Sequence, residues 1–354
     1  MTEYEVDDEI AAFFAKTTAT REECEAKCRE LTQSRRLAPV PVQGVCSYTV
    51  YGGDNLEYVI QCRLKSLALK TEMSDLATKV HGSLVPTVSF HGALGTEQDR
   101  REPLLVYLMT RMSGITQLDF MLARNIPQTA QEFYPLRQNF FSSVASFFAQ
   151  SWLAPQKVCA KYRDELEKSH RRDLNLLLDG LPERFRPHIQ TCLASLNDIM
   201  ALPMVLLHKD FGACNLLVDP QSCCLKGVID WAEAVISPFG LNLHSLQAFA
   251  GSMHLRNGWS RFPDYGALEH TFWSSFSREV GGISPETLVT IKRARMLGHF
   301  LSHGFTSRLA NEAEPVPLKD DDHGQYHMMY LDGYWINPTT KVDDLDMKSI
   351  STRH

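Results

Sequence analysis

The stretch that decides the fold is residues 205–231, which read VLLHKDFGACNLLVDPQSCCLKGVIDW. Residues 216–218 and 225–229 are mostly apolar and rich in strand-forming residue types, and the Asp-Pro-Gln-Ser sequence at 219–222 is typical of a turn. A hairpin at this place would return Asp230 to the neighbourhood of Asn215 and Asp210. The sequence therefore predicts that a loop carboxylate, an amide and a strand-end carboxylate converge.

These three groups suit phosphoryl transfer from ATP, in which the protein mainly positions groups and neutralises charge. Asp210 would orient the acceptor hydroxyl or amine and accept its proton. Asn215 and Asp230 would bind Mg²⁺, which prefers oxygen ligands. The alternative is structural: Asp210 caps a helix, Asn215 lies in a turn and Asp230 ends a strand. That alternative is preferred for any one residue alone, whereas the spacing of all three favours catalysis.

The pattern His208-x-Asp210-x4-Asn215, followed by Ile229-Asp230-Trp231, resembles the catalytic loop and metal-binding strand end of aminoglycoside phosphotransferase-like enzymes. The resemblance is strongest to a fungal subgroup of that family and extends over most of the chain. It implies an α+β, bilobal protein-kinase-like fold, with a small antiparallel-sheet N-lobe and a larger, mainly helical C-lobe. It also implies ATP and Mg²⁺ as cofactors. It gives almost no information on the molecule that accepts the phosphoryl group.

Composition restricts the possible partners and locations of the protein. The chain has 354 residues, 44% of them hydrophobic and 22% charged, with a net charge of −6. No block of Lys and Arg indicates a nucleic-acid partner, and no apolar run of about 18 residues predicts a membrane span. The acidic start predicts a cytoplasmic protein. The nine cysteines are odd in number and lie mostly in apolar runs, which does not suggest disulfides.

The chain divides into three predicted segments: an N-terminal helical extension at 1–35, an N-lobe at 36–109 and a C-lobe at 110–354. The extension either packs on the small lobe or forms a solvated arm. Changes of pattern in residues 38–63 predict strands at 40–42, 47–51 and 56–63. Apolar residues at helical spacing predict helices at 66–81, around 140–148, at 160–178, at 185–199 and at 286–303.

The resemblance places a nucleotide-covering loop at the turn that contains Gly44, where Ser47 or nearby backbone N–H groups would contact phosphate oxygens. It also places the hinge between the lobes at residues 110–114. The Thr110 carbonyl and the Met112 N–H would then hydrogen-bond adenine.

The third predicted strand departs from the family pattern. Kinase-like enzymes have a lysine there that contacts the phosphates and pairs with a helix glutamate, and Gln61 occupies that position. Arg63, two residues further on, shares the same face of the strand and would supply the cation. We expect Arg63 to pair with Glu72. The alternative is a solvated Arg63 and a degraded nucleotide site.

Further candidates surround the catalytic loop. His208 would orient the loop by hydrogen bonding, and Lys209 would either approach the γ-phosphate or face solvent. Glu233 would touch metal or substrate, or else lie at the surface. Relatives commonly hold an aspartate near Asn242 that braces the loop, and Asn242 would accept the same hydrogen bonds without charge.

The leading hypothesis is a small-molecule kinase that phosphorylates a hydroxyl or, with less support, an amine. Its partner would be a small-molecule acceptor, and the enzyme would be a monomer or a homodimer. The first alternative is a pseudokinase that acts as a nucleotide-binding scaffold. Pseudokinases typically lose the base or the metal ligands, whereas Asp210, Asn215 and Asp230 are all present. The second alternative is a kinase-fold enzyme of altered chemistry in natural-product assembly.

Overall fold

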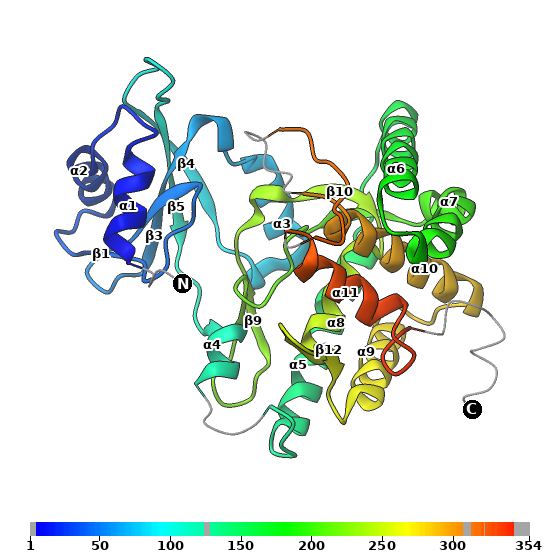
Figure 1. The fold of residues 1–354 in the computed structure, drawn as a ribbon. Helices are drawn as coiled ribbons and strands as arrows, with labels where there is room; N and C mark the ends of the chain where they lie inside the picture. The colour runs from blue at the N-terminus through cyan, green and yellow to red at the C-terminus, as the bar shows by residue number, and fades with distance from the viewer. Residues whose placement is uncertain (1–4, 124–127, 307–312, 322, 343–354) are drawn as a thin grey trace. The chain divides into compact units, whose positions relative to one another are not determined.

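A computed structural model describes residues 5–123, 128–306, 313–321 and 323–342. The chain forms two compact units (Figure 1). The first contains residues 1–113 and the segment Gly227–Ala232, and the second contains the rest of the described chain. The first unit therefore extends four residues beyond the predicted end of the N-lobe and includes the segment that carries Asp230. The outer ends of the predicted first and last segments, residues 1–4 and 343–354, lie outside the described residues.

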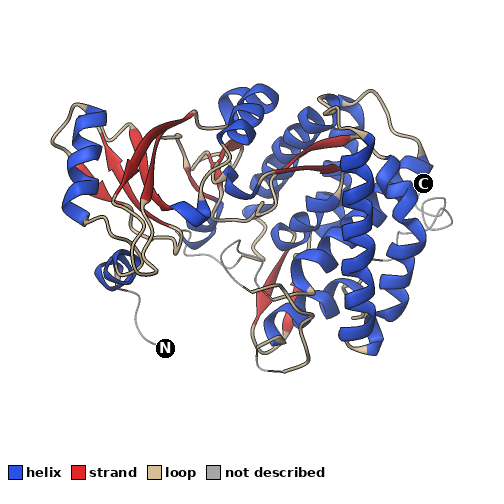
Figure 2. Ribbon diagram, turned by 90° about the horizontal axis from the view of Figure 1, so that it is seen from above, coloured by secondary structure: helices blue, strands red, loops and turns tan. Residues whose placement is uncertain are grey.

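The first unit is built on an antiparallel sheet with the strand order β1-β2-β3-β5-β4 (Figure 2, strands in red). Its strands are β1 (Leu37–Pro39), β2 (Ser47–Gly52), β3 (Tyr58–Leu64), β4 (Val88–Leu94) and β5 (Leu104–Thr110). The strand predicted at 40–42 is not formed, and β1 ends at Pro39. Pro39 and Pro41 lack the N–H group that a strand ladder needs, which accounts for the early end.

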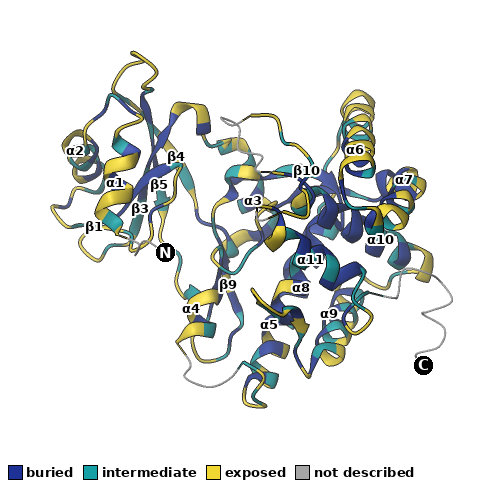
Figure 3. Ribbon diagram, in the orientation of Figure 1, coloured by how far each residue is buried: buried dark blue, intermediate teal, exposed yellow. Residues whose placement is uncertain are grey.

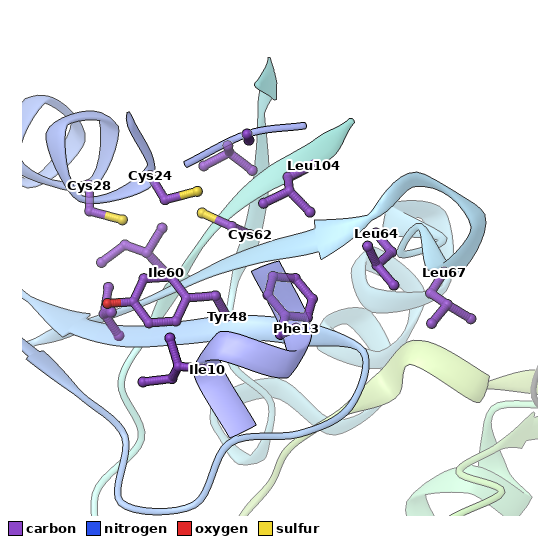
Figure 4. Packing of buried hydrophobic residues seen from close by; sticks show 13 residues of the cluster. Ile10, Phe13, Cys24, Cys28, Tyr48, Ile60, Cys62, Leu64, Leu67 and Leu104 are labelled. Atoms are coloured by element: carbon purple, nitrogen blue, oxygen red, sulfur yellow. The ribbon is translucent and has the colours of Figure 1, made fainter. Parts of the chain in front are cut away.

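One face of this sheet carries the hydrophobic core of the first unit (Figure 4). Helices α1 (Val6–Phe14) and α2 (Arg21–Thr32) supply the other side of this core. The thiols of Cys24 and Cys28 on α2 contact Cys62 on β3, and all three side chains are fully buried. Thr20 and Glu23 form a capping box that starts α2. The N-terminal extension therefore packs on the small sheet rather than forming a solvated arm.

The helix predicted at 66–81 begins later and presents a different face. A 3-10 turn, η1 (Lys65–Leu67), precedes α3 (Thr71–His81), and a second turn, η2 (Gly82–Leu84), follows it. The buried residues of α3 are Ser74, Ala77 and His81. Glu72, which we expected beside the buried stripe, is exposed.

The second unit is mainly helical. Its helices are α4 (Gln117–Leu122), α5 (Phe133–Leu153), α6 (Ala160–Gly180), α7 (Arg186–Ala201), α8 (Ser245–Phe249), α9 (Tyr265–Glu279), α10 (Pro285–His303) and α11 (Gln325–Trp335), with 3-10 turns η3 (Glu183–Phe185) and η5 (Leu241–His244). Its strands are β6 (Ile115–Thr116), β7 (Met204–Leu207), β8 (Leu216–Val218), β10 (Val235–Pro238), β11 (Gly251–His254) and β12 (Gly258–Arg261), while β9 (Leu225–Val228) and η4 (Trp231–Glu233) cross between the units.

The predicted helices of the C-lobe correspond to α5, α6, α7 and α10, and the predicted hairpin corresponds to β8 and β9. Most of α10 is buried, whereas much of α6 is exposed (Figure 3). The expected α+β class, a small antiparallel sheet plus a mainly helical remainder, is confirmed. Across the described ranges, no helix has the length and apolar character that crossing a membrane requires.

A buried ion pair in the second unit connects α5 to the segment before α9. The guanidinium of Arg137 on α5 donates two hydrogen bonds from Nε and one from Nη2 to the carboxylate of Asp264, at 2.8–3.2 Å. Both side chains are at most 5% exposed. The Arg137 Nη1 also donates to the Gln128 carbonyl. Removing one member of such a pair leaves an unpaired buried charge, so this contact ties α5 firmly to the segment before α9.

Four histidines meet where η5, α10 and α11 pack together. Trp335 Nε1 donates to His299 Nδ1 at 2.8 Å, and the Nδ1 atoms of His303 and His327 lie 3.1 Å apart. The rings of His244 and His299 are 5.6 Å apart. Burial lowers the pKa of all four imidazoles, that of His244 to about 3. Because His299 accepts a hydrogen bond at Nδ1, protonating that atom would break the bond to Trp335.

We predict that the free energy of unfolding falls as the pH decreases below about 6.5, the ordinary pKa of histidine. The unfolded chain then binds protons that the buried histidines of the folded chain exclude. Replacing His299→Gln should reduce the slope of unfolding free energy against pH by up to about 1.4 kcal/mol per pH unit. Urea denaturation followed by tryptophan fluorescence at several pH values measures this slope.

The matched control is His270→Gln, because His270 lies on the exposed side of α9. This variant should keep the wild-type slope. A His299→Gln protein with the wild-type slope would show that His299 does not contribute to the acid sensitivity.

Candidate active site

The loop after β7 is anchored by Phe211, which is fully buried. Its ring lies 5.3 Å from that of Phe147 and 5.1 Å from that of Phe148, both on α5, and 6.4 Å from Phe249 on α8. Asp210 precedes this anchor and is exposed. An apolar residue directly after the aspartate is the sequence signal for this anchor, and our sequence analysis did not use it. The buried ring therefore fixes the loop while the adjacent carboxylate stays accessible.

Asp210 and Asn215 are in direct contact. The Asn215 amide nitrogen donates to the Asp210 carboxylate Oδ2 at 2.8 Å and to the Asp210 carbonyl at 2.9 Å. Both amide protons are thereby engaged, which leaves the Asn215 Oδ1 as the atom that can bind a metal. The second carboxylate oxygen of Asp210 faces Gly212, where an added Cβ would lie 3.5 Å away. The structure thus brings together two of the three predicted residues, and the convergence with Asp230 stays a prediction.

His208 and Asn242 lie behind the loop and are both buried. The Asn242 amide donates to the His208 carbonyl at 3.4 Å. Asn242 Oδ1 is a buried oxygen that has no hydrogen-bond partner within the described chain. The contact places Asn242 as a brace for the loop backbone, and a role for the His208 ring in orienting the loop stays a prediction.

The surface around Asp210 is acidic. Partial burial and the carboxylates of Asp210 and Asp119 raise the pKa of the Cys214 thiol. Asp119 lies in the first turn of α4, whose Leu118 N–H donates to the Ala213 carbonyl of the loop at 3.2 Å. Lys209 is exposed and forms no ion pair with any described residue. Its predicted contact with the γ-phosphate stays a prediction.

Asp230 belongs to the first unit and follows β9. Its backbone has φ +60°, in the left-handed region where aspartate is enriched among non-glycine residues. The next residue, Trp231, is buried, its Nε1 donates to the Val228 carbonyl, and its ring lies 5.5 Å from that of His81 on α3. Trp231 therefore fixes the segment within its unit. Glu233 is exposed at the end of η4, and the roles of Asp230 and Glu233 stay predictions.

The sheet face opposite the hydrophobic core carries a group of polar side chains. In the register of β2 and β3, Ser47 pairs with Arg63 and Thr49 pairs with Gln61, so these four side chains share one face. The hydroxyls of Ser47 and Thr49 lie 3.1 Å apart, and both residues are buried. Sequence analysis predicted Ser47, Gln61 and Arg63 for this site and missed Thr49. The signal for Thr49 was its position two residues after Ser47 on the same strand.

The predicted ion pair between Arg63 and Glu72 is not formed. Arg63 Nε donates to the Leu67 carbonyl at 3.0 Å, and Nη1 donates to the Gln61 Oε1 at 3.2 Å. The η1 turn brings the Leu67 carbonyl to Arg63, and the late start of α3 leaves Glu72 exposed. Arg63 itself is 6% exposed, so the alternative of a solvated strand end is also wrong.

The loop before β2 is held by Gln43, a residue that sequence analysis missed. Its side-chain oxygen accepts from the Thr49 N–H at 2.9 Å, and its amide donates to the Thr49 carbonyl at 2.9 Å, as a strand partner would. Gly44, next in the chain, has no positive φ, and an added Cβ would meet nothing within 4 Å. The observed loop conformation therefore does not require a glycine at this position.

The predicted hinge contacts lie at the end of β5. The Thr110 N–H donates to the Thr87 carbonyl, and its hydroxyl accepts from the Thr87 N–H. Arg111 lies between Thr110 and Met112, and its guanidinium stacks 3.9 Å above the ring of Tyr51. Arg111 thereby pins this segment to β2, and backbone contacts of Thr110 and Met112 with a base stay predictions.

The donor sets fit the expected cofactors chemically. The Asn215 amide oxygen and the Asp230 carboxylate are each, taken separately, hard ligands of the kind that Mg²⁺ binds. Among the described residues, no group of three or more His, Cys, Asp or Glu side chains is arranged to hold a metal ion. The hydroxyls, the amide and the guanidinium on the polar sheet face are donors of the kind that bind phosphate.

Several solved structures are similar to this chain at low sequence identity. The GDP complex of wild-type aminoglycoside 2'-phosphotransferase-IIIa is 14% identical and gives a TM-score of 0.47, with 75% of this chain and 82% of that chain covered. An APH(3'')-Id aminoglycoside phosphotransferase from Streptomyces rimosus is 14% identical at a TM-score of 0.44, covering 82% and 98%. A glucosamine kinase is 14% identical at 0.47, covering 80% and 77%. No curated protein matches the chain.

The model of one protein family matches residues 61–261, more than half of the chain. The matched region contains the candidate residues Gln61, Arg63, Asp210, Asn215 and Asp230. This chain belongs to the phosphotransferase enzyme family.

Proposed function

We propose that this chain is a small-molecule kinase that transfers the γ-phosphoryl group of Mg²⁺-bound ATP to a hydroxyl group. The observation that carries the proposal is the contact between Asn215 and Asp210. It holds one carboxylate oxygen of Asp210 and leaves the other accessible for the proton of the acceptor. It also leaves the Asn215 oxygen available to a metal. Family membership supports the same reaction class.

In this proposal Asp210 is the catalytic base that orients the acceptor hydroxyl and takes its proton. Asn215 and Asp230 provide oxygen ligands for Mg²⁺, which neutralises phosphate charge when it is bound. His208 and Asn242 hold the loop backbone behind Asp210. Glu233 and Lys209 are assigned to the surroundings of the substrate phosphate and the metal.

The acceptor class is part of the proposal and rests on membership of the phosphotransferase enzyme family. We therefore propose a hydroxylated, small-molecule acceptor for a cytoplasmic enzyme that is a monomer or a homodimer. Nucleotide consumption with ATP and with GTP should be measured against sugars, amino-alcohols and polyketide alcohols. Mass analysis of the products distinguishes added phosphate from added AMP or lost water.

We predict that Asp210→Asn lowers kcat at least about 100-fold, because the amide cannot accept the proton. The fold and the affinity for ATP should change little, because the anchor at Phe211 is untouched. The matched control is Asp219→Asn, which removes a carboxylate that accepts hydrogen bonds in the turn after β8. That control should retain turnover, and full activity of Asp210→Asn would remove Asp210 from the mechanism.

We predict that Asn215→Ala raises the Mg²⁺ concentration needed for half-maximal activity by at least about tenfold, because a metal ligand is lost. Titrating Mg²⁺ at saturating ATP measures this change. The control variant is Asn139→Ala, because the Asn139 amide only donates to the Ser222 carbonyl at the surface. An unchanged Mg²⁺ requirement in Asn215→Ala would contradict the assignment of Asn215 as a metal ligand.

A further inference from the structure

Arg63 carries a charge that no described residue neutralises. It is 6% exposed, and its recorded hydrogen bonds go to two neutral acceptors, the Leu67 carbonyl and the Gln61 side chain. Within the described ranges no carboxylate lies in ion-pair distance of its guanidinium. A buried charge without a counter-ion is unfavourable, and native proteins pair such charges or use them to bind a ligand. Among the described residues, Arg63 therefore has hydrogen-bond partners but no counter-ion, and a bound anion would supply the missing negative charge.

The groups beside Arg63 are arranged as donors. Ser47 and Thr49 share one hydroxyl proton in their mutual hydrogen bond, so the other hydroxyl proton remains to be donated. Gln61 directs its oxygen at the guanidinium, which leaves its amide N–H groups to donate as well. Tyr107 pairs with Gln61 in the register of β3 and β5, and its hydroxyl accepts a hydrogen bond from the Leu69 N–H. None of these groups offers a negative charge.

We infer that Arg63, Gln61, Ser47 and Thr49 form a phosphate-binding cradle on the polar face of the sheet, in which Gln61 is a positioning residue for the guanidinium. The hydrogen bond from Nη1 to Gln61 and that from Nε to Leu67 fix the planar fork from two directions. A guanidinium held in one orientation can donate to two phosphate oxygens at once, whereas a lysine ammonium acts as a single point charge. The identity of the anion as the diphosphate part of a nucleotide rests on the proposed function. The cradle itself follows from the geometry alone.

The cradle differs from the expected arrangement of this strand. The strand position that we matched to the phosphate-contacting lysine holds an uncharged residue, Gln61, and the positive charge is two residues further on the same face. Gln61 then orients Arg63 through its side-chain oxygen, and its amide N–H groups remain to donate. The prediction that Arg63 supplies the cation in place of the lysine thus becomes a statement about Arg63 and Gln61 acting together.

The first test measures the binding of ADP, adenosine and pyrophosphate to the full chain by calorimetry. Arg63→Ala should weaken ADP binding about 10- to 100-fold and leave adenosine binding unchanged, because adenosine has no phosphate. The matched control is Arg36→Ala, because Arg36 is exposed in the same unit and donates to the Asp54 carbonyl. This control should bind ADP as the wild type does. Arg63→Lys retains the charge and provides the measurement if Arg63→Ala does not fold.

The second test separates positioning by Gln61 from a merely structural role. Gln61→Ala should weaken ADP binding about three- to tenfold. Gln61→Glu should weaken it further, because the new carboxylate would pair with Arg63 and neutralise the charge that binds phosphate. The same ion pair should leave the stability of Gln61→Glu equal to or above that of the wild type. A structural role alone predicts that ADP binding and stability change together.

Specific outcomes would overturn this inference. Wild-type ADP affinity in Arg63→Ala or in Gln61→Glu would show that the cradle does not bind phosphate. Equal losses for ADP and adenosine in Arg63→Ala would assign the effect to the fold of the unit. Equal affinity of the wild type for pyrophosphate and ADP would make the ligand a free anion rather than a nucleotide. Binding losses as expected, in a protein without turnover on any acceptor, would support the cradle and contradict the proposed kinase reaction.

Discussion

The chemistry assigned to this chain depends on the hydrogen bonds from the Asn215 amide to Asp210. Without them the carboxylate would rotate freely in an exposed loop, and the amide oxygen would have no fixed direction. Phe211 supplies the second constraint, because its burial among aromatic rings of α5 and α8 holds the backbone beside Asp210. The loop thus combines one buried anchor with one exposed, oriented carboxylate. A base in phosphoryl transfer needs this combination, since positioning provides most of the catalysis.

The alternation of side chains along β3 organises the first unit in a similar way. Ile60, Cys62 and Leu64 face α1 and α2 and build the hydrophobic core, while Gln61 and Arg63 face the opposite side. Because the period of a strand is two residues, one segment supplies both the core and the polar face. The helices α1 and α2 cover only the apolar face. The polar groups on the opposite face are buried or half-buried as well and are hydrogen-bonded to one another and to the Leu67 carbonyl.

The sequence predicted well those features that depend on local patterns. The hairpin of β8 and β9 follows from two apolar runs and an Asp-Pro turn, and the contact of Asn215 with Asp210 follows from their spacing in one loop. Features that depend on tertiary contacts were predicted less well. Glu72 was assigned to the wrong face because the 3-10 turn η1 delays α3, and nothing in the local pattern marks that turn. The histidine cluster joins three elements that are far apart in sequence, so no periodicity could indicate it.

The cradle around Arg63 connects stability with binding. Folding places the guanidinium in a buried position where, among the described residues, it meets neutral oxygens and no carboxylate, which is less favourable than an ion pair in the same place. A carboxylate at position 61 would remove this penalty, but it would also remove the unneutralised charge that attracts phosphate. Gln61 has nearly the same shape as glutamate and orients the guanidinium without neutralising it. Arg63 and Gln61 thus make the first unit less stable than an ion pair would, and they provide an oriented positive charge. Such a loss of stability is typical of functional sites. A ligand that supplies the missing negative charge would bind the folded state alone and would stabilise it in proportion to its concentration.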